Sequence, residues 1–217
     1  MNNRTCYIVG AGDNYGLDFI VADGDFVIAA DGGLVYLQEL GITADLIIGD
    51  FDSLSQKPQS PNVISLHSIK DDTDMLAAVR EGMKRGYASF HFYCGTGGRI
   101  EHTLANIQTL GYLSSIGMRG YLIDRDEAIT AITNGGISYA DCCMGYLSVF
   151  SFSDRTNGVC LKGLKYELVN AALTNTFPVG VSNEFIGAVS TVSVNDGTLM
   201  VVFPRKHLKD IMPLCLT

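Results

Sequence analysis

The stretch that decides the fold is Asp45-Leu46-Ile47-Ile48-Gly49-Asp50-Phe51-Asp52-Ser53. Its apolar first half is typical of a strand buried on both faces of a parallel sheet, and two carboxylates follow directly. Residues two apart in an extended segment project the same way, so Asp50 and Asp52 are expected to face one ligand. Because a plain turn rarely needs two acids around a bulky aromatic residue, the segment indicates a binding site.

Residues 1 to about 125 alternate short apolar runs with amphipathic stretches. The runs are bounded by turn residues, and the apolar residues between them recur at helical spacing. This alternation predicts an open parallel α/β sheet. The expected strands are Cys6–Val9, Phe26–Ala30, Asp45–Ile48, Val63–Leu66, Phe90–Cys94 and Gly120–Ile123. The expected buried helix faces carry Leu34, Leu37 and Leu40, then Met75, Leu76, Val79 and Met83, and finally Leu104, Ile107, Leu110 and Leu113.

From about Glu127 onward the helical period is replaced by short strand-like segments between turns such as Thr156-Asn157-Gly158. Repeated short strands of this kind predict a smaller all-β sandwich. We therefore expect an α/β domain over residues 1–126 and a β-sandwich domain over residues 127–217. The expected strands of the second domain are Ala128–Thr133, Tyr146–Phe152, Val159–Leu164, Ala188–Val194 and Thr198–Phe203.

Composition argues against several classes of function. The chain has 217 residues and a net charge of −8, whereas a nucleic-acid surface would carry a basic stripe. No apolar run is long enough to cross a membrane. Residues Met1 to Thr5 lack the basic-then-apolar pattern of an export signal, so we expect a cytoplasmic protein.

The cysteines show no C-x-x-C pair, and most lie in apolar, strand-like runs. We therefore expect buried, reduced thiols rather than disulfides or a zinc site. The six cysteines are Cys6, Cys94, Cys142, Cys143, Cys160 and Cys215.

Carboxylates follow three of the expected strands. Ligands of open α/β sheets bind outside the carboxyl ends of the strands. Asp31 follows the second strand, and Asp71, Asp72 and Asp74 follow the fourth and open a helix. Like charges gathered at one edge favour a divalent cation, and Mg²⁺ is usually held by one or two carboxylates plus substrate phosphates. An alternative is that Asp72 or Asp74 only caps the helix, and that Asp31 only forms a turn.

A glycine-rich loop, Gly95-Thr96-Gly97-Gly98-Arg99, connects the fifth strand to the next helix. Such a loop lets backbone N–H groups approach a phosphate at a helix N-terminus. Arg99, His102 and Asn106 share one helix face by their spacing, and Arg99 can bind phosphate through two hydrogen bonds. Lys70 is a second candidate phosphate contact. No G-x-x-x-x-G-K-[ST] motif occurs, so a Walker-type site is excluded.

Two other classes of function are open at this point. Residues Val9 to Gly16 loosely resemble the dinucleotide fingerprint, with Asp31 near the place of the ribose-binding acid, which would suit an NAD(P)-dependent oxidoreductase. The spacing G-x-G-x-x-x-G, however, misses the third glycine of the standard fingerprint. Hydride transfer also gives no reason for Asp50, Asp52 and Asp74 to lie close together. A non-catalytic vitamin-binding protein would not need the metal carboxylates.

At these positions the chain resembles the thiamine pyrophosphokinases, and the matching segments run in the family's order over nearly the whole chain. They are Ala30-Asp31-Gly32-Gly33, Gly49-Asp50-Phe51-Asp52-Ser53, Lys70-Asp71-Asp72-Thr73-Asp74, the stretch Gly97 to Asn106, Gly163 to Leu168, and Gly180-Val181-Ser182-Asn183-Glu184.

The resemblance implies an α/β catalytic domain, a β-sandwich domain, and a homodimer with thiamine sites between subunits. It also implies transfer of the pyrophosphoryl group of ATP to the thiamine hydroxyl, which gives thiamine diphosphate and AMP. Glu101 departs from the family, because many members have Asp there. Tyr166 stands where some members have Trp, and is expected to stack on a thiamine ring.

Residues and resemblance together assign roles to individual positions. The expected catalytic residues are Asp50, Asp52, Asp71, Asp74 and Arg99. The expected ATP or phosphate contacts are Asp31, Ser53, Lys70, Thr73, Gly98, Arg99 and His102. The resemblance alone implies the thiamine contacts Tyr166, Ser182 and Asn183. The expected Mg²⁺ ligands are Asp50, Asp52 and Asp74.

Overall fold

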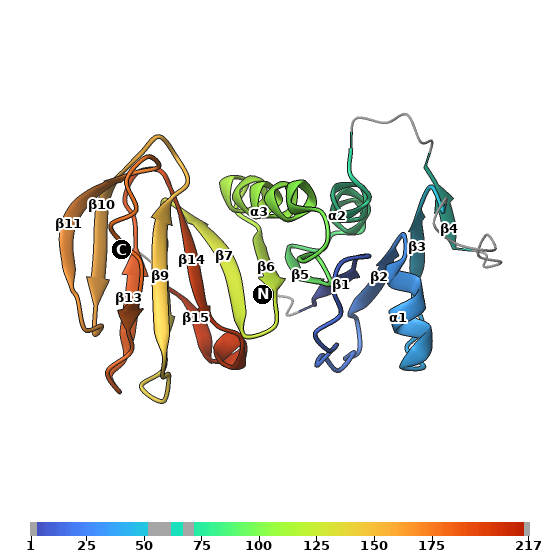
Figure 1. Ribbon diagram of the computed structural model, residues 1–217, viewed down its shortest axis with the longest axis horizontal. Helices are drawn as coiled ribbons and strands as arrows, with labels where there is room; N and C mark the ends of the chain where they lie inside the picture. Colours follow the sequence, from blue (N-terminus) through green and yellow to red (C-terminus); the bar gives the residue numbers. More distant parts are fainter. Residues whose placement is uncertain (1–3, 52–61, 67–71, 215–217) are drawn as a thin grey trace. The chain divides into compact units, whose positions relative to one another are not determined.

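The computed structural model describes residues 4–51, 62–66 and 72–214 (Figure 1). The chain divides into two compact units. Unit 1 comprises Met1–Thr109 and Gly120–Arg125, and unit 2 comprises Leu110–Arg119 and Asp126–Thr217. In the described part of the chain, no helix combines the length and the apolar character that crossing a bilayer requires.

Unit 1 contains the predicted parallel sheet, with the strand order β6-β5-β1-β2-β3-β4. Parallel pairing joins β1 to β2 and β5, β2 to β3, and β3 to β4. The chain therefore steps outward from β1 to β4 and then returns to β5 on the other side of β1. The strands are β1 (Cys6–Val9), β2 (Phe26–Ala30), β3 (Leu46–Gly49), β4 (Val63–Ser65), β5 (Ser89–Tyr93) and β6 (Arg119–Ile123).

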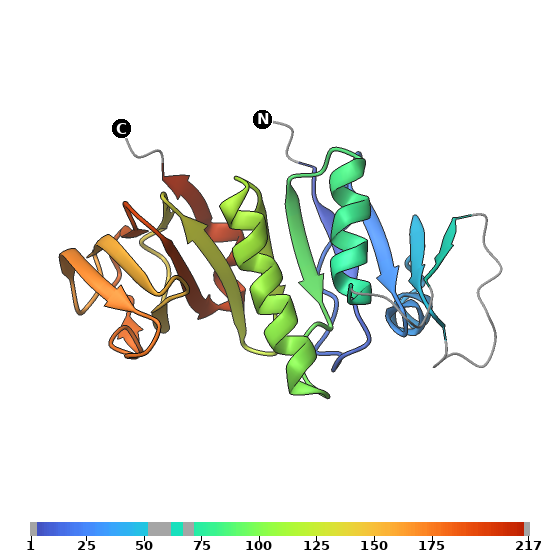
Figure 2. The same ribbon diagram turned by 90° about the horizontal axis from the view of Figure 1, so that it is seen from above.

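Helices α1 (Gly33–Glu39) and α2 (Asp74–Lys84) pack on opposite faces of this sheet (Figure 1; Figure 2). A third helix, α3 (Ile100–Ser115), begins in unit 1 and ends in unit 2. Two predicted core positions are wrong, because Leu40 and Leu104 are 54% and 56% exposed. Leu40 follows the last residue of α1 and so leaves its buried face, and α3 buries its second half instead, at Leu110 and Leu113.

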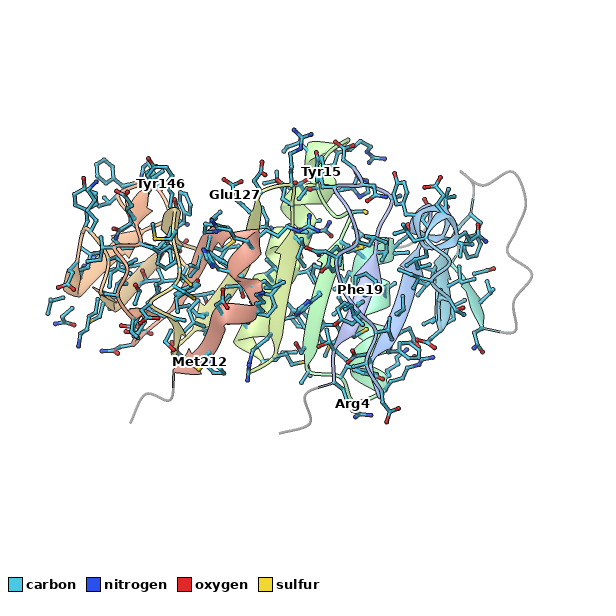
Figure 3. The ribbon with its side chains drawn as sticks, turned by 90° about the horizontal axis from the view of Figure 1, so that it is seen from below. Arg4, Tyr15, Phe19, Glu127, Tyr146 and Met212 are labelled. Carbon is cyan, nitrogen blue, oxygen red and sulfur yellow. The ribbon has the colours of Figure 1, made fainter. Side chains whose placement is uncertain are left out.

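The connection from β1 to β2, residues 10–25, contains neither helix nor strand and crosses one face of the sheet. The Phe19 ring stacks on Tyr7 with centroids 4.2 Å apart and lies 5.0 Å from the ring of Tyr93. Figure 3 shows Phe19 over the sheet, between Tyr15 at one end of the strands and Arg4 at the other. This segment therefore takes the place that a helix would have in a regular α/β unit.

Unit 2 contains the predicted all-β part, which is built from two layers of antiparallel strands, together with the end of α3. The cores of the two layers meet at Tyr139, whose ring lies 5.6 Å from Phe203 and 5.2 Å from Phe185. One sheet has the order β12 (Asn183–Glu184), β9 (Tyr146–Ser151), β14 (Thr198–Pro204) and β7 (Glu127–Thr133). The other has the order β11 (Leu168–Thr174), β10 (Arg155–Lys162), β13 (Ser190–Ser193), β8 (Gly136–Tyr139) and β15 (Ile211–Leu214), and a short 3-10 helix, η1 (Arg205–Asp210), precedes β15.

The turn predicted at Thr156-Asn157-Gly158 is wrong, because these residues lie inside β10. The register of β10 against β11 shifts between Thr156 and Val159, and Gly158 has a φ of 67°. A β-bulge uses glycine in this conformation just as a turn does. The same residues therefore bend a strand here instead of ending one.

The stacking of Phe19 predicts a difference between two adjacent substitutions. Because the ring is half-buried, Phe19→Ala should lower the free energy of unfolding by about 2 kcal/mol, less than a fully buried phenylalanine costs. Ile20→Ala is the matched control, since Ile20 is 88% exposed and should change the value by less than about 0.5 kcal/mol. Urea unfolding measures both. Equal effects of the two substitutions would mean that the segment does not pack on the sheet.

Candidate active site

The strand order reverses at β1, and there two loops approach each other closely. Gly10 N–H donates to the Tyr93 carbonyl at 2.9 Å, Gly12 N–H to that of Cys94 at 2.8 Å, and Asp13 N–H to that of Thr96 at 2.9 Å. A Cβ atom on Gly12 would overlap the carbonyl oxygen of Thr96, so this contact requires glycine. Gly10 and Gly12 therefore hold the loop after β1 against the loop after β5.

A cavity of about 710 Å³ opens at this point, beside the carboxyl ends of the strands. Its walls come from the loops that follow β1, β2, β3 and β5 and from the first turns of α2 and α3. Open α/β sheets bind ligands at such a reversal of strand order. The predicted site residues that line the cavity are Asp31, Asp50, Thr73, Asp74, Gly98, Arg99 and His102.

Residues just after three strands that end at or beside the cavity have an unusual backbone conformation. Asp31, Phe51 and Cys94 follow β2, β3 and β5, and their φ angles are 50°, 59° and 51°. Residues other than glycine adopt this region rarely, and such strain is concentrated at functional sites. Phe51 is 3% exposed, so its buried ring fixes the chain just where Asp50 faces the cavity.

The start of α2 adds further acids to the same cavity. The Thr73 hydroxyl caps the helix by accepting the Leu76 N–H at 3.2 Å. The alternative in which Asp72 or Asp74 supplies the cap is therefore wrong. Asp72 forms an ion pair with Arg80 at 2.5 Å, and Asp74 lines the cavity from the first turn of the helix.

The glycine loop with its arginine also lines the cavity. Gly97 and Gly98 have φ angles of 77° and 57°, so both use the left-handed region that favours glycine. The Arg99 side chain is 71% exposed, and its Nε donates to Glu101 Oε1 at 2.7 Å. A backbone hydrogen bond, and then the bond from Arg99, lower the pKa of Glu101. Glu101, whose side chain is longer than the Asp of many family members, thus holds Arg99 at the rim of the cavity.

Asn106 and Thr96 support the glycine loop in ways that the sequence did not reveal. Asn106 lines the cavity with Arg99 and His102, as their spacing predicts. Asn106 is nevertheless buried, and its Nδ2 donates to the Gly95 carbonyl at 2.6 Å. The Thr96 hydroxyl donates to Asp124 at 2.7 Å. These partners come from other parts of the chain, so spacing alone carried no signal for them.

The predicted thiamine contacts lie together in unit 2. Asn183 is buried, and its side-chain amide accepts the Tyr166 N–H at 3.0 Å and donates to the Tyr166 carbonyl at 2.7 Å. Ser182 has a φ of 57° and donates its N–H to the Ser148 hydroxyl at 3.0 Å. Asn183 therefore fixes the backbone that presents Tyr166, whose side chain is exposed. Contact of these residues with the vitamin stays a prediction.

Four predicted site residues lie outside the described ranges, namely Asp52, Ser53, Lys70 and Asp71.

The dinucleotide alternative is not supported by the fold. The fingerprint needs a helix directly after β1, whose N-terminus would hold the pyrophosphate. Residues 10–25 form no helix, and their first glycines are engaged with the loop after β5. The contact with the loop after β5 therefore explains why Gly10 and Gly12 are glycines, without a bound dinucleotide.

Comparison with known proteins gives one consistent result. Residues 18–121 match the family model of the thiamin pyrophosphokinase catalytic domain, and residues 136–199 match that of the thiamin pyrophosphokinase vitamin B1 binding domain. The thiamine pyrophosphokinase of Bacillus subtilis is 30% identical over 184 residues, which cover 81% of the chain and 85% of that protein. A match to the catalytic domain also argues against a non-catalytic vitamin-binding protein.

Solved structures show the same likeness over both units. The crystal structure of the Bacillus subtilis enzyme matches with a TM-score of 0.82 and 27% identity, covering 92% of this chain and 98% of that one. A thiamin pyrophosphokinase family protein from Enterococcus faecalis matches with a TM-score of 0.79 and 27% identity, covering the same shares. Sequence and structure therefore agree that the chain belongs to the thiamine pyrophosphokinase family.

Proposed function

We propose that the cavity of unit 1 holds ATP with Mg²⁺ and that the residues around it carry the reaction of the family. The chain is an enzyme that transfers the pyrophosphoryl group of ATP to thiamine. The observation that carries the proposal is the placement of opposite charges in one cavity. Asp31, Asp50 and Asp74, here called the acidic wall, line the same cavity as the glycine loop with Arg99, here called the basic wall.

The donor chemistry of the acidic wall fits Mg²⁺. Carboxylate oxygens are the ligands that this cation prefers, and it usually takes one or two of them together with substrate phosphates. Asp50 and Asp74 would hold the ion, together with Asp52 from outside the described ranges. Bound there, Mg²⁺ would neutralise charge on the phosphates of ATP.

The basic wall would bind and orient the polyphosphate. Arg99 and Gly98 line the cavity, and Lys70, from outside the described ranges, would add a second cation. Asn106 keeps the loop in place through its bond to Gly95. Positioning and electrostatic stabilisation supply most of the acceleration in phosphoryl transfer. The thiamine hydroxyl would attack in line as AMP leaves, with Asp71 or Asp74 as the proton acceptor.

We further propose that residues 1–126 form the catalytic domain and residues 127–217 the thiamine-binding domain, with Tyr166, Ser182 and Asn183 near the vitamin. We also propose a homodimer, as the resemblance to the family implies, and unit 2 exposes several apolar side chains that a second subunit would cover. A cytoplasmic location is supported by the five described cysteines, all of which are free thiols. The exposed apolar residues include Tyr146, Tyr166, Val169, Phe177, Val179 and Val189.

Replacing one acid of the cavity tests the proposed ATP site. Asp50→Asn should lower kcat on the order of 10²–10³-fold, because one charge that acts on the phosphates is lost. The assay supplies ATP, Mg²⁺ and thiamine and measures AMP and thiamine diphosphate. Asp23→Asn is the matched control, since Asp23 is exposed and does not line the cavity. Normal turnover of Asp50→Asn would contradict the assignment, and release of ADP with thiamine monophosphate would indicate a simple kinase.

Tyr166 allows a separate test of the thiamine site. Tyr166→Ala should raise the KM for thiamine about tenfold and leave the KM for ATP unchanged, since loss of stacking costs about 1–1.5 kcal/mol. The side chain is 61% exposed, so its removal leaves the core intact. Tyr112→Ala, at a 42% exposed tyrosine of α3, should change neither constant. An unchanged thiamine KM in Tyr166→Ala would remove this residue from the site.

A further inference from the structure

Unit 2 contains a cluster of metal-ligating side chains that the proposed reaction does not use. One ligand atom from each of Cys142, Cys143 and Asp210 lies within 4.8 Å of the other two. The two cysteines belong to the connection between β8 and β9, and Asp210 ends η1. None of the three lines the cavity of unit 1. The cluster therefore shares no residue with the proposed ATP site.

Backbone hydrogen bonds already hold these two segments together. Cys143 N–H donates to the Ala140 carbonyl at 3.2 Å, which closes the turn that carries both cysteines. Ala140 N–H in turn donates to the Asp210 carbonyl at 3.4 Å. The sulfur atoms and the carboxylate are thus brought together by the fold itself, without a metal ion.

His207 contacts the Asp210 carboxylate and so orients it. It is 7% exposed, and its Nδ1 lies 3.0 Å from Asp210 Oδ2. Met144 N–H reaches His207 Nε2 at 3.0 Å. Nε2 also lies 3.1 Å from the Met144 carbonyl oxygen. In the tautomer whose Nε2 accepts the Met144 N–H, Nδ1–H donates a hydrogen bond to Asp210. Carboxylates that ligate a metal are commonly oriented by such an outer hydrogen bond.

We propose that Cys142, Cys143 and Asp210 form a binding site for a thiophilic divalent cation of the Zn²⁺ type, with His207 as the residue that positions Asp210. Two sulfur ligands and one carboxylate are a donor set that suits Zn²⁺, whereas Mg²⁺ and Ca²⁺ prefer oxygen ligands alone. Cys142 is exposed, so the site is open to solvent and a water molecule can complete a tetrahedral shell.

A cobalt titration of the full-length chain tests the proposal. The chain is reduced, stripped of metal, and titrated with Co²⁺, which reports thiolate ligands by charge-transfer absorption, in the presence of excess Mg²⁺. We expect one equivalent of Co²⁺ per chain with this absorption, and its displacement by Zn²⁺. Cys160→Ser, which removes a thiol outside the cluster, should behave like the original chain.

Substitutions distinguish the proposed metal ligands from His207, the residue that positions Asp210. Cys142→Ser and Asp210→Asn should both lose stoichiometric binding. His207→Gln should keep the absorption but weaken cobalt binding about 10- to 100-fold, as expected for an outer partner. Circular dichroism confirms that each variant is folded. The proposal is overturned by absence of a thiolate band, by a band that persists in Cys142→Ser, or by displacement of Co²⁺ with Mg²⁺.

Discussion

The hydrogen bonds between the loop after β1 and the loop after β5 shape the cavity that we propose as the ATP site. Gly10 and Gly12 bring the two backbones together at the point where the strand order reverses. Since β2 and β3 lie on one side of β1 and β5 on the other, the loops of both sides meet around the same cavity. A side chain at Gly12 would separate these loops and open the cavity wall.

Charge then gives the cavity its chemical character. The acids of one wall repel one another, and a divalent cation is the simplest compensation. The same cavity is lined by Arg99 and the N-terminal end of α3, which favour negative charge. A polyphosphate bound with a cation satisfies both walls at once, whereas a single phosphate or a neutral ligand satisfies only one. The arrangement therefore suits the nucleotide substrate of a pyrophosphokinase.

Local sequence patterns predicted most of this fold and part of the site. Strands buried on both faces are continuous apolar runs, and the predicted bounds of β1 and β2 are those observed. The pattern failed for β11, which is largely exposed, and for β15, which contains Pro213. Acids at strand ends were predictable for the same local reason. The bond of Asn106 to Gly95 and the contact of Cys142 with Asp210 join distant segments, so no local pattern could reveal them.

The central claim is that both walls of the cavity act together on one ligand, ATP with its cation. Isothermal titration of the purified chain with ATP, first with Mg²⁺ and then with a chelator in place of Mg²⁺, measures this most directly. We expect binding of one ATP per chain with Mg²⁺ and a loss of affinity of at least about tenfold, roughly 1.4 kcal/mol, without it. Equal affinity under both conditions would contradict the account, because the acidic wall would then contribute nothing to nucleotide binding.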